Sequence, residues 1–312
     1  MNKPIGGYHE LELWKGEHFH KKALRLNTAR NCFEYVLRAR GYRKVYIPYY
    51  ACEVMLEPIN KLGISYEFYN INEDFEPIQN IQLCDREAFL YTNYFGIKQL
   101  CVEKLAQIYG NRLIIDNAQA FFAKPLDGID TFYSCRKFFG VPDGAYLYTD
   151  CFLATRFEQD HSYTRISHLL KRIDLSAEDG YKDFQQAEDL LCNQSILTMS
   201  KFTELLLSSI NYSDIVHKRR ANYEILRKSL GGKELLDDDV PMVFPYLAND
   251  GQSLRKNLIQ NKIFVAKYWP NVEEWAGKDA LETWMANNIL PLPIDQRYGV
   301  EDMQRIINTI LG

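Results

Sequence analysis

The sequence predicts an α/β fold with a three-layer α/β/α large domain, in which a mostly parallel sheet lies between two layers of helices. A small C-terminal α/β domain is expected to follow it. Two observations carry this prediction. Short apolar runs of strand length alternate with helix-like segments through the first half of the chain, and such alternation is typical of a parallel sheet with helical crossovers. The chain then ends in a strongly amphipathic helix pattern over residues 300–311, whose apolar face holds Met303, Ile306, Ile307 and Ile310.

The elements of the first half follow from spacing and from helix start and stop signals. A first helix is predicted after Asn27 and Thr28 and ends at Gly41, with apolar residues recurring at helical spacing: Cys32, Phe33, Val36 and Leu37. Further helices are predicted over residues 53–61, closed by Gly63, and over residues 102–108. The predicted strands cover residues 44–48, 65–70, 88–92, 111–116 and 131–134.

From residue 157 to residue 230 the pattern is mostly helical. Asp214 is expected to cap a helix that ends at Gly231 and carries the apolar stripe Tyr223, Leu226 and Leu230. A smaller α/β unit follows this helical stretch. The predicted domains are therefore a large one over residues 1–211 and a small one over residues 212–312.

Composition and charge exclude several classes of protein. The 312 residues carry 37 Lys and Arg against 41 Asp and Glu, a net charge of −4 that does not suit nonspecific binding of nucleic acid. No apolar run approaches the roughly 18 residues of a membrane-spanning helix. The N-terminal MNKPIGGYHELEL lacks the apolar core of a signal peptide. We therefore expect a cytoplasmic protein with neither nucleic acid nor membrane as a partner.

The seven cysteines are scattered, and no two stand at C-x-x-C spacing. Neither a disulfide scaffold nor a zinc site is predicted from them. The histidines form no H-E-x-x-H pair, so no metal mechanism is predicted either. Most of the cysteines are expected to be buried, reduced thiols.

Asp116 stands at the end of the predicted strand in IIDNAQA, residues 114–120. Open α/β sheets bind ligands at the carboxyl ends of their strands, and a buried carboxylate needs a cationic or hydrogen-bond-donating partner. A protonated heterocyclic nitrogen on a cofactor would be such a partner. The alternative for this motif alone is an aspartate that caps the next helix.

Lys137 lies three residues after Ser134 in YSCRKFFGVPDGAYLY, residues 133–148. With Phe138 and Phe139 beside it, the side chain is expected to be partly desolvated, which favours the free, nucleophilic amine. Such an amine forms a Schiff base with a carbonyl cofactor. An exposed turn lysine is the alternative. The S-x-x-K spacing also occurs in penicillin-recognising enzymes, but the accompanying S-D-N and K-T-G motifs are absent.

The turn at Asn27 and Thr28 opens the first predicted helix. The free N–H groups and the positive end of the dipole at a helix start suit a phosphate group. An ordinary helix cap has the same appearance in sequence.

In this order, a phosphate-binding helix start, a strand-end aspartate and a lysine after the next strand resemble the fold-type I pyridoxal-phosphate enzymes, whose fold is aspartate-aminotransferase-like. More narrowly, the chain resembles the DegT/StrS family of sugar aminotransferases. The matching segments are LNTARNCFEYVL, VYIPYYACEVMLEPINKLGISYEFY, LYTNYFGI, IIDNAQAFF, YSCRKFFGVPDGAYLY, LRKNLIQNKIFVAKYWP and ILPLPIDQRYGVEDMQRIINTIL. The resemblance covers most of the chain and is weakest over residues 151–193.

The resemblance implies the roles of three polar residues. Lys137 would bind pyridoxal 5'-phosphate covalently and then serve as the general base and acid of the proton shift. Asp116 would keep the pyridine nitrogen protonated, so that the ring withdraws negative charge. Gln119 would form a hydrogen bond on the side of the cofactor's 3-hydroxyl group.

The resemblance also implies a phosphate site and a ring-covering residue. Ser134 would hold the phosphate together with the amides around Thr28 and Ala29. An aromatic side chain normally covers the ring, and Tyr50 is the candidate, although Cys52 lies closer to the aligned position.

The chain departs from the family pattern at the phosphate turn. That turn reads Asn27-Thr28-Ala29-Arg30 where the family has S-G-T, so the helix would present Arg30 to substrate or phosphate. The interval from Asp116 to Lys137 is also shorter than is common in the family. Family members with histidine at the lysine position are dehydratases, so the lysine here favours transamination.

For substrates and partners, the resemblance implies a keto-sugar linked to a nucleoside diphosphate, with glutamate or glutamine as amino donor, in polysaccharide biosynthesis. It also implies a homodimer with active sites at the subunit interface. An anionic substrate needs local positive charge, for which Arg136, Lys171-Arg172 and residues 218–220 are candidates, the last favoured as a solvated helix face. A dehydratase or epimerase on the same cofactor, and a non-catalytic regulator that keeps the fold, are the alternatives.

Overall fold

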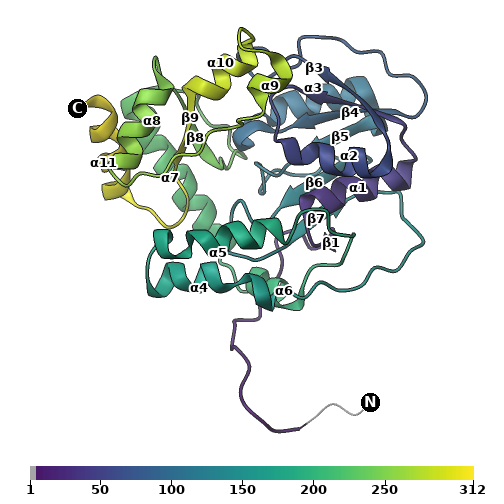
Figure 1. Cartoon of the computed structure of the whole chain (residues 1–312), viewed down its shortest axis with the longest axis horizontal. Coiled ribbons are helices and arrows are strands. Elements are labelled where there is room, and N and C mark those ends of the chain that lie inside the picture. The colour runs from purple at the N-terminus through teal and green to yellow at the C-terminus, as the bar shows by residue number, and fades with distance from the viewer. Residues whose placement is uncertain (1–4) are drawn as a thin grey trace.

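The large sheet organises the chain (Figure 1). The computed structural model describes residues 5–312. The first four residues of MNKPIGGYHELEL, the segment in which no signal peptide is predicted, lie outside the described residues. Seven strands are hydrogen-bonded in the order β1-β7-β6-β5-β4-β2-β3. Their bounds are β1 Leu24–Leu26, β2 Lys44–Pro48, β3 Ser65–Tyr69, β4 Glu87–Thr92, β5 Leu113–Asp116, β6 Asp130–Ser134 and β7 Ala145–Tyr148.

Most neighbouring strands of this sheet run parallel. The pairs β3–β2, β2–β4, β4–β5 and β5–β6 are parallel, whereas β7 is antiparallel to both β6 and β1. Parallel neighbours need long connections, and helices lie in two of them: α2 Leu56–Leu62 between β2 and β3, and α3 Gln99–Tyr109 between β4 and β5. Helix α1 Ala29–Arg40 leads from β1 to the more distant β2. The predicted mostly parallel sheet is confirmed.

Side chains that alternate along the central strands separate two apolar layers. On β4, Ala88 and Leu90 pack in the cluster that contains the apolar face of α1, whereas Phe89 and Tyr91 pack in the cluster that contains α3. The alternation follows from the two-residue period of a strand, which sends successive side chains to opposite faces. Both faces of the sheet are therefore covered, which confirms the predicted three-layer arrangement.

The second half of the chain is mainly helical. Two helices, α4 Ser167–Asp174 and α5 Ala177–Asp189, form a hairpin below the sheet in Figure 1. The other helices are α6 Lys201–Ser208, α7 Tyr212–Leu230, α8 Gly251–Gln260, α9 Val272–Ala276, α10 Leu281–Asn288 and α11 Val300–Leu311, and four 3₁₀ turns cover Glu53–Met55, Tyr94–Gly96, Gly110–Arg112 and Tyr163–Arg165. Among residues 5–312, no helix combines the length and the apolarity needed to cross a bilayer.

A second, two-stranded antiparallel sheet lies among the C-terminal helices. Its strands are β8 Val243–Leu247 and β9 Ile289–Pro293, and one apolar cluster joins them to α7, α8 and α11. A separate core of this kind supports the division into residues 1–211 and 212–312, which we retain as a proposal.

Three local predictions need correction. Asn211, not Asp214, caps α7, because the Asn211 side chain accepts a hydrogen bond from the Asp214 amide at 3.3 Å. The helix predicted over residues 53–61 begins as a 3₁₀ turn, and α2 starts only at Leu56. Of the seven cysteines, all free, three are buried, two are partly buried and two are exposed, so burial is not their common property.

His20 provides a test of stability in acid. The side chain is buried against Phe121 and Tyr133, with its Nε2 atom 2.7 Å from the Phe121 carbonyl oxygen. Burial lowers the pKa of His20 from 6.5 to about 4. Between these pH values the unfolded chain binds a proton that the folded chain does not, so the free energy of unfolding falls as the pH drops below 6.5. We expect His20 to lower the free energy of unfolding by about 3 kcal/mol between pH 7 and pH 4.

Urea unfolding of a His20→Gln variant between pH 4 and pH 7 measures that contribution. Glutamine can still donate to the Phe121 carbonyl group but does not titrate. The variant should lose stability less steeply than the parent chain over this range, whereas His217→Gln, at an exposed position, should leave the slope unchanged. Equal slopes for the parent and His20→Gln would contradict the assignment.

Candidate active site

Three chain segments reach the same edge of the large sheet. Strands β5 and β6 are parallel neighbours, so Asp116 and Ser134, their last residues, lie at one edge. Strand β1 is antiparallel to β7, which is antiparallel to β6, so β1 also ends there. Helix α1 begins three residues after β1. The topology thus brings the predicted phosphate turn, the strand-end aspartate and the lysine loop to one place.

Asp116 is buried, with 6% of its surface exposed. Its Oδ1 atom accepts a hydrogen bond from the Ala118 amide at 2.7 Å. Burial raises the pKa of the Asp116 carboxyl group, while the nearby Lys137 ammonium, the Ala118 amide and the Thr92 hydroxyl act in the opposite direction. The carboxylate therefore lies in a setting that favours an additional cationic or donating partner.

Lys137 is exposed, which corrects the expectation of a desolvated lysine. Its neighbours Phe138 and Phe139 are buried in an apolar cluster together with Tyr133. The aromatic side chains of the loop therefore pack into the core and leave the lysine on its surface. The Lys137 charge lies close enough to lower the pKa of the Asp116 carboxyl group, so the lysine and the strand-end aspartate belong to the same region of the sheet edge.

A buried polar network that the sequence did not reveal anchors the lysine loop to α6. The Asp143 carboxylate, which has no exposed surface, accepts hydrogen bonds from the Ser200 amide at 2.8 Å, the Ser200 hydroxyl at 2.7 Å and the Thr203 hydroxyl. Gly144 follows with a φ of 108°, and a Cβ atom there would lie 2.9 Å from Thr203. In the triplet Pro142-Asp143-Gly144, the aspartate is therefore needed as a hydrogen-bond acceptor, and the glycine is needed because a larger residue would not fit its backbone conformation.

Arg219 holds the same loop from the C-terminal side and corrects a second expectation. Residues 218–220 were favoured as a solvated face, yet Arg219 is 1% exposed. Its guanidinium lies 4.5 Å from the centre of the Phe138 ring and donates to Gln296 at 3.1 Å. Gln296 in turn donates to the Phe138 carbonyl oxygen at 2.8 Å. Burial lowers the pKa of Arg219 to about 10. The only hint of this role in the sequence was that Arg219 is a basic residue within an amphipathic helix.

Gln119 presents a buried donor without a partner. Its Oε1 atom accepts a hydrogen bond from the Phe95 amide at 2.8 Å, whereas its Nε2 group is buried and has no partner in the described part of the chain. Buried polar groups are normally paired. An oxygen atom of a ligand beside Asp116 would satisfy this donor, as the predicted role of Gln119 requires.

The start of α1 has the geometry of a phosphate site. The Thr28 hydroxyl accepts from the Asn31 amide at 3.1 Å and donates to the Asn31 side chain, so it serves as the helix cap. The first two amides of the helix, those of Ala29 and Arg30, precede these capped positions and have no intrahelical acceptor. These amides, rather than the Thr28 hydroxyl, remain available to an anion.

The two candidates for covering the cofactor ring differ in exposure. Tyr50 has no exposed surface, and Trp269 lies against its ring at a centroid distance of 5.1 Å. Cys52 is only partly buried. Packing of residues 266–276 against residues 49–52 therefore buries Tyr50 and leaves Cys52 partly accessible. The ring-covering role remains a prediction for both residues.

The two predicted substrate arginines are already paired. Arg30 donates to Glu57 at 2.6 Å, and Arg136 forms an ion pair with Glu188 on α5. Burial lowers the pKa of Arg136 to about 10. A direct role in binding substrate would require either arginine to share or exchange its carboxylate partner.

Comparison with known proteins identifies solved structures that share the fold of this chain. No protein-family model matches the sequence, and no curated protein matches it. Among solved structures, a DegT DnrJ EryC1 StrS aminotransferase from Brucella abortus is 14% identical, with a TM-score of 0.60 over 92% of this chain and 84% of that chain. The chain has the fold of the sugar aminotransferases.

Two further structures of this fold were solved with informative ligands. Spr1654 from Streptococcus pneumoniae, described as a sugar aminotransferase, was solved in a PLP-form; it is 14% identical, with a TM-score of 0.63 over 92% of this chain and 85% of that chain. DesI was solved in the presence of its TDP-sugar product; it is 15% identical, with a TM-score of 0.60 over 92% of this chain and 79% of that chain. The predicted aspartate-aminotransferase-like fold is thereby confirmed.

Proposed function

We propose that this chain is a pyridoxal-phosphate-dependent aminotransferase that converts a nucleotide-linked keto-sugar into an amino-sugar. The observation that carries the proposal is the sheet edge that brings the end of β5, with the buried Asp116 carboxylate, beside the end of β6 and the following loop, which holds the exposed Lys137. The shared fold with Spr1654, which was solved in both a PLP-form and a PMP-form, supports the choice of cofactor.

The residues present fit that cofactor. Within residues 5–312, Lys137 is the cation whose charge acts on the buried Asp116 carboxyl group, and the Gln119 Nε2 group has no acceptor. The Ala29 and Arg30 amides at the start of α1 are free of intrahelical bonds and suit a phosphate. When bound, pyridoxal phosphate supplies an electron sink for the negative charge that develops on the amino-acid carbon.

The chain's own residues then have distinct tasks. Asp116 would hold a proton at the pyridine nitrogen, which would keep the electron sink strong. Gln119 would donate to the ring oxygen, and Ser134 and the Ala29 amide would orient the phosphate. Lys137 would provide the nucleophilic amine and would serve as the base and acid of the proton shift.

The substrate and the cellular role extend this proposal. We include glutamate or glutamine as amino donor, a nucleoside diphosphate on the sugar, and a place in polysaccharide biosynthesis in the cytoplasm. DesI, solved with its TDP-sugar product, supports the nucleotide-linked substrate. Retention of a lysine at position 137 favours transamination over dehydration.

We also propose a homodimer with active sites at the subunit interface. The N-terminal segment leaves the body of the molecule in Figure 1. It carries the exposed apolar side chains of Ile5, Tyr8, Leu11 and Trp14. Large exposed apolar groups gathered on one segment are typical of a contact with another chain.

The half-reaction with an amino donor tests the proposed function. Purified protein loaded with pyridoxal phosphate should convert to the pyridoxamine form when glutamate or glutamine is added, as followed by absorption. Addition of a dTDP-linked or UDP-linked keto-hexose should reverse the conversion and yield an amino-sugar. No conversion with either donor would refute the proposal, and loss of a hydroxyl group from the sugar without amination would identify a dehydratase.

A further inference from the structure

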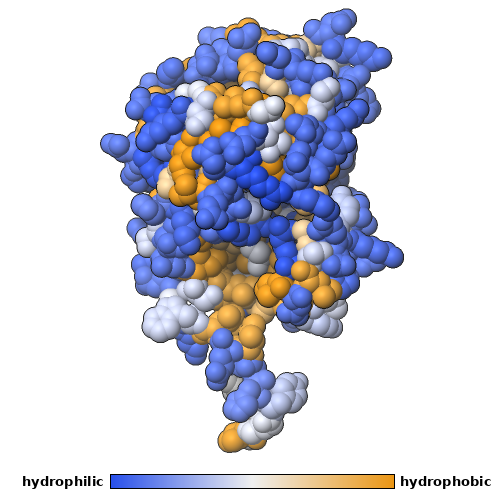
Figure 2. All heavy atoms as spheres, turned by 90° about the vertical axis from the view of Figure 1, so that its left-hand side faces the viewer, coloured by the Kyte–Doolittle hydropathy of each residue, from blue (hydrophilic) through white to orange (hydrophobic). Residues whose placement is uncertain are grey.

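A cavity separate from the Asp116–Lys137 pair opens between the α4–α5 hairpin and the C-terminal helices. Its volume is about 640 Å³, within the range of small-molecule sites. Figure 2 views this face and shows apolar surface inside a hollow below the C-terminal unit, with hydrophilic residues at its rim. The mixture of apolar walls and charged rim is suited to a ligand that has both a ring and an anionic group.

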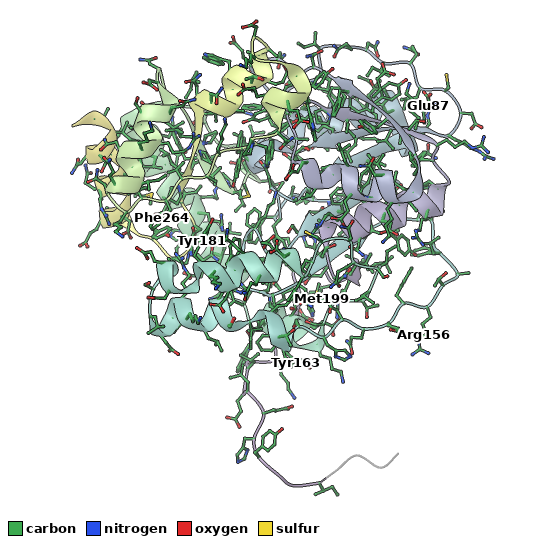
Figure 3. The ribbon with its side chains drawn as sticks, viewed as in Figure 1. Glu87, Arg156, Tyr163, Tyr181, Met199 and Phe264 are labelled. Atoms are coloured by element: carbon green, nitrogen blue, oxygen red, sulfur yellow. The ribbon has the colours of Figure 1, made fainter. Side chains whose placement is uncertain are left out.

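Aromatic side chains stand on two walls of this cavity. Tyr181 belongs to α5 and Phe264 to the loop after α8, and Figure 3 shows them beside the gap between these elements. Tyr181 is 59% exposed and Phe264 is 53% exposed, so much of each ring is accessible, although Phe184 stacks on Tyr181 at a centroid distance of 6.3 Å. Tyr298, near the start of α11, adds a third ring. Planar ligands stack on such rings without needing a particular pattern of hydrogen bonds.

The charges around the cavity are mainly positive and only partly neutralised. Both acidic groups of the lining are engaged: Glu178 pairs with Lys262 at 2.8 Å, and Asp302 accepts from the Gly299 amide at 3.0 Å. Arg172 has no ion pair or hydrogen bond with another residue of the 5–312 range.

Two other arginines complete the rim. Arg297 is held by Asp295 through two hydrogen bonds of 2.7 and 2.8 Å. Arg305 donates to the Asn261 carbonyl oxygen and forms no ion pair with another residue of the 5–312 range. Arg172 and Arg305 therefore offer two guanidinium groups outside any ion pair of that range, one from α4 and one from α11, and planar guanidinium groups bind phosphate oxygens in pairs.

Both walls of the cavity are connected to the lysine loop. On α5, Glu188 pairs with Arg136, next to Lys137, and Tyr181 lies seven residues earlier, about 10 Å along the helix. On the other wall, Gln296 is adjacent to Arg297 and donates to the Phe138 carbonyl oxygen at 2.8 Å. Both walls of the cavity are thus joined by polar contacts to residues that flank Lys137 in the chain.

We propose that this cavity binds the nucleoside diphosphate portion of the substrate, with the base against Tyr181 and Phe264 and the diphosphate at Arg172 and Arg305. The inference rests on the proposed function and adds a site for the part of the substrate that does not react. A site built from the α4–α5 hairpin also explains how a chain of net charge −4 attracts an anionic substrate.

Calorimetric titration of the pyridoxal-phosphate-loaded protein with UDP, dTDP, CDP and GDP tests the site. At least one nucleotide should bind, and Arg172→Glu should weaken its binding by about tenfold or more, because a charge-assisted bond becomes a repulsion. Phe264→Ala should weaken binding several-fold. Arg172→Glu should raise KM for the nucleotide-linked keto-sugar.

Arg156→Glu and Tyr163→Ala provide matched controls. Both residues are exposed, lie outside the cavity lining and are labelled in Figure 3. They should leave nucleotide binding unchanged. Absence of binding by all four nucleotides, equal affinity in Arg172→Glu, or an equal loss in Arg156→Glu would each overturn the inference. The half-reaction with glutamate is read separately, so its failure would count against the proposed function and not against the cavity.

Discussion

Replacing Lys137 by alanine is expected to lower the rate of amino transfer by about 10³-fold or more, because the variant lacks both the nucleophile and the group that moves the proton. Borohydride treatment of the pyridoxal-phosphate-loaded parent should attach the cofactor covalently to Lys137, as mass spectrometry of the peptide would show. The alanine variant should show no attachment at this position. Since Lys137 is exposed, the free energy of unfolding should change by about 0.5 kcal/mol or less.

Two further variants separate the amine from its charge. Lys137→Arg keeps a cation opposite Asp116 but has no amine to attack a carbonyl group, so it should be as inactive as the alanine variant. Lys124→Ala removes an exposed lysine that pairs with Asp238 on the surface and should retain full activity. Activity in Lys137→Arg close to that of the parent would show that charge alone suffices and would refute the nucleophilic role.

Replacing Asp116 by asparagine is expected to lower the rate of amino transfer by about 100-fold or more, because a neutral amide cannot hold a proton at the pyridine nitrogen. The side chain keeps its shape, and its oxygen can still accept from the Ala118 amide. Loss of activity without loss of the fold would therefore point to charge. Circular dichroism and the unfolding midpoint monitor the fold.

The pH dependence of cofactor binding gives Asp116 a second readout. Burial raises the pKa of this carboxyl group, so its charge is lost on acidification earlier than that of an ordinary aspartate. Affinity of the ligand-free protein for pyridoxal phosphate should fall as the pH is lowered through this range, and the Asp116→Asn variant should lack that dependence. The exposed Asp127 provides the control variant Asp127→Asn, which should behave as the parent does. An identical profile in Asp116→Asn would contradict the role of the carboxylate.

The strands and helices of the large sheet could be predicted because their signals are local. Strand β2 occupies the predicted residues 44–48, and α11 the predicted residues 300–311. Gly41 ends α1 in the left-handed conformation that glycine adopts without strain. The cap of α7 was misplaced by three residues because Asn211 and Asp214 are both good caps, and only the path of the chain before the helix decides between them.

The candidate site also has some features that could be predicted from the sequence and others that could not. Asp116 and Lys137 could be found from sequence because each stands at a fixed offset from a strand end. The surroundings of the lysine could not, because the expectation of a desolvated amine depended on where Phe138 and Phe139 point. In the structure these rings enter the core and leave Lys137 exposed.

The sequence by itself determined the alternating strands and helices between residues 28 and 134, the sheet's mostly parallel character and the positions of Asp116 and Lys137, since each depends on residues close together in the chain. The tertiary structure decided the rest. It buried Tyr50 against Trp269, placed Arg219 over Phe138 and set Arg172 across a cavity from Arg305. These pairs join residues that are far apart in sequence, and no local pattern specifies which distant side chain fills or charges a given space.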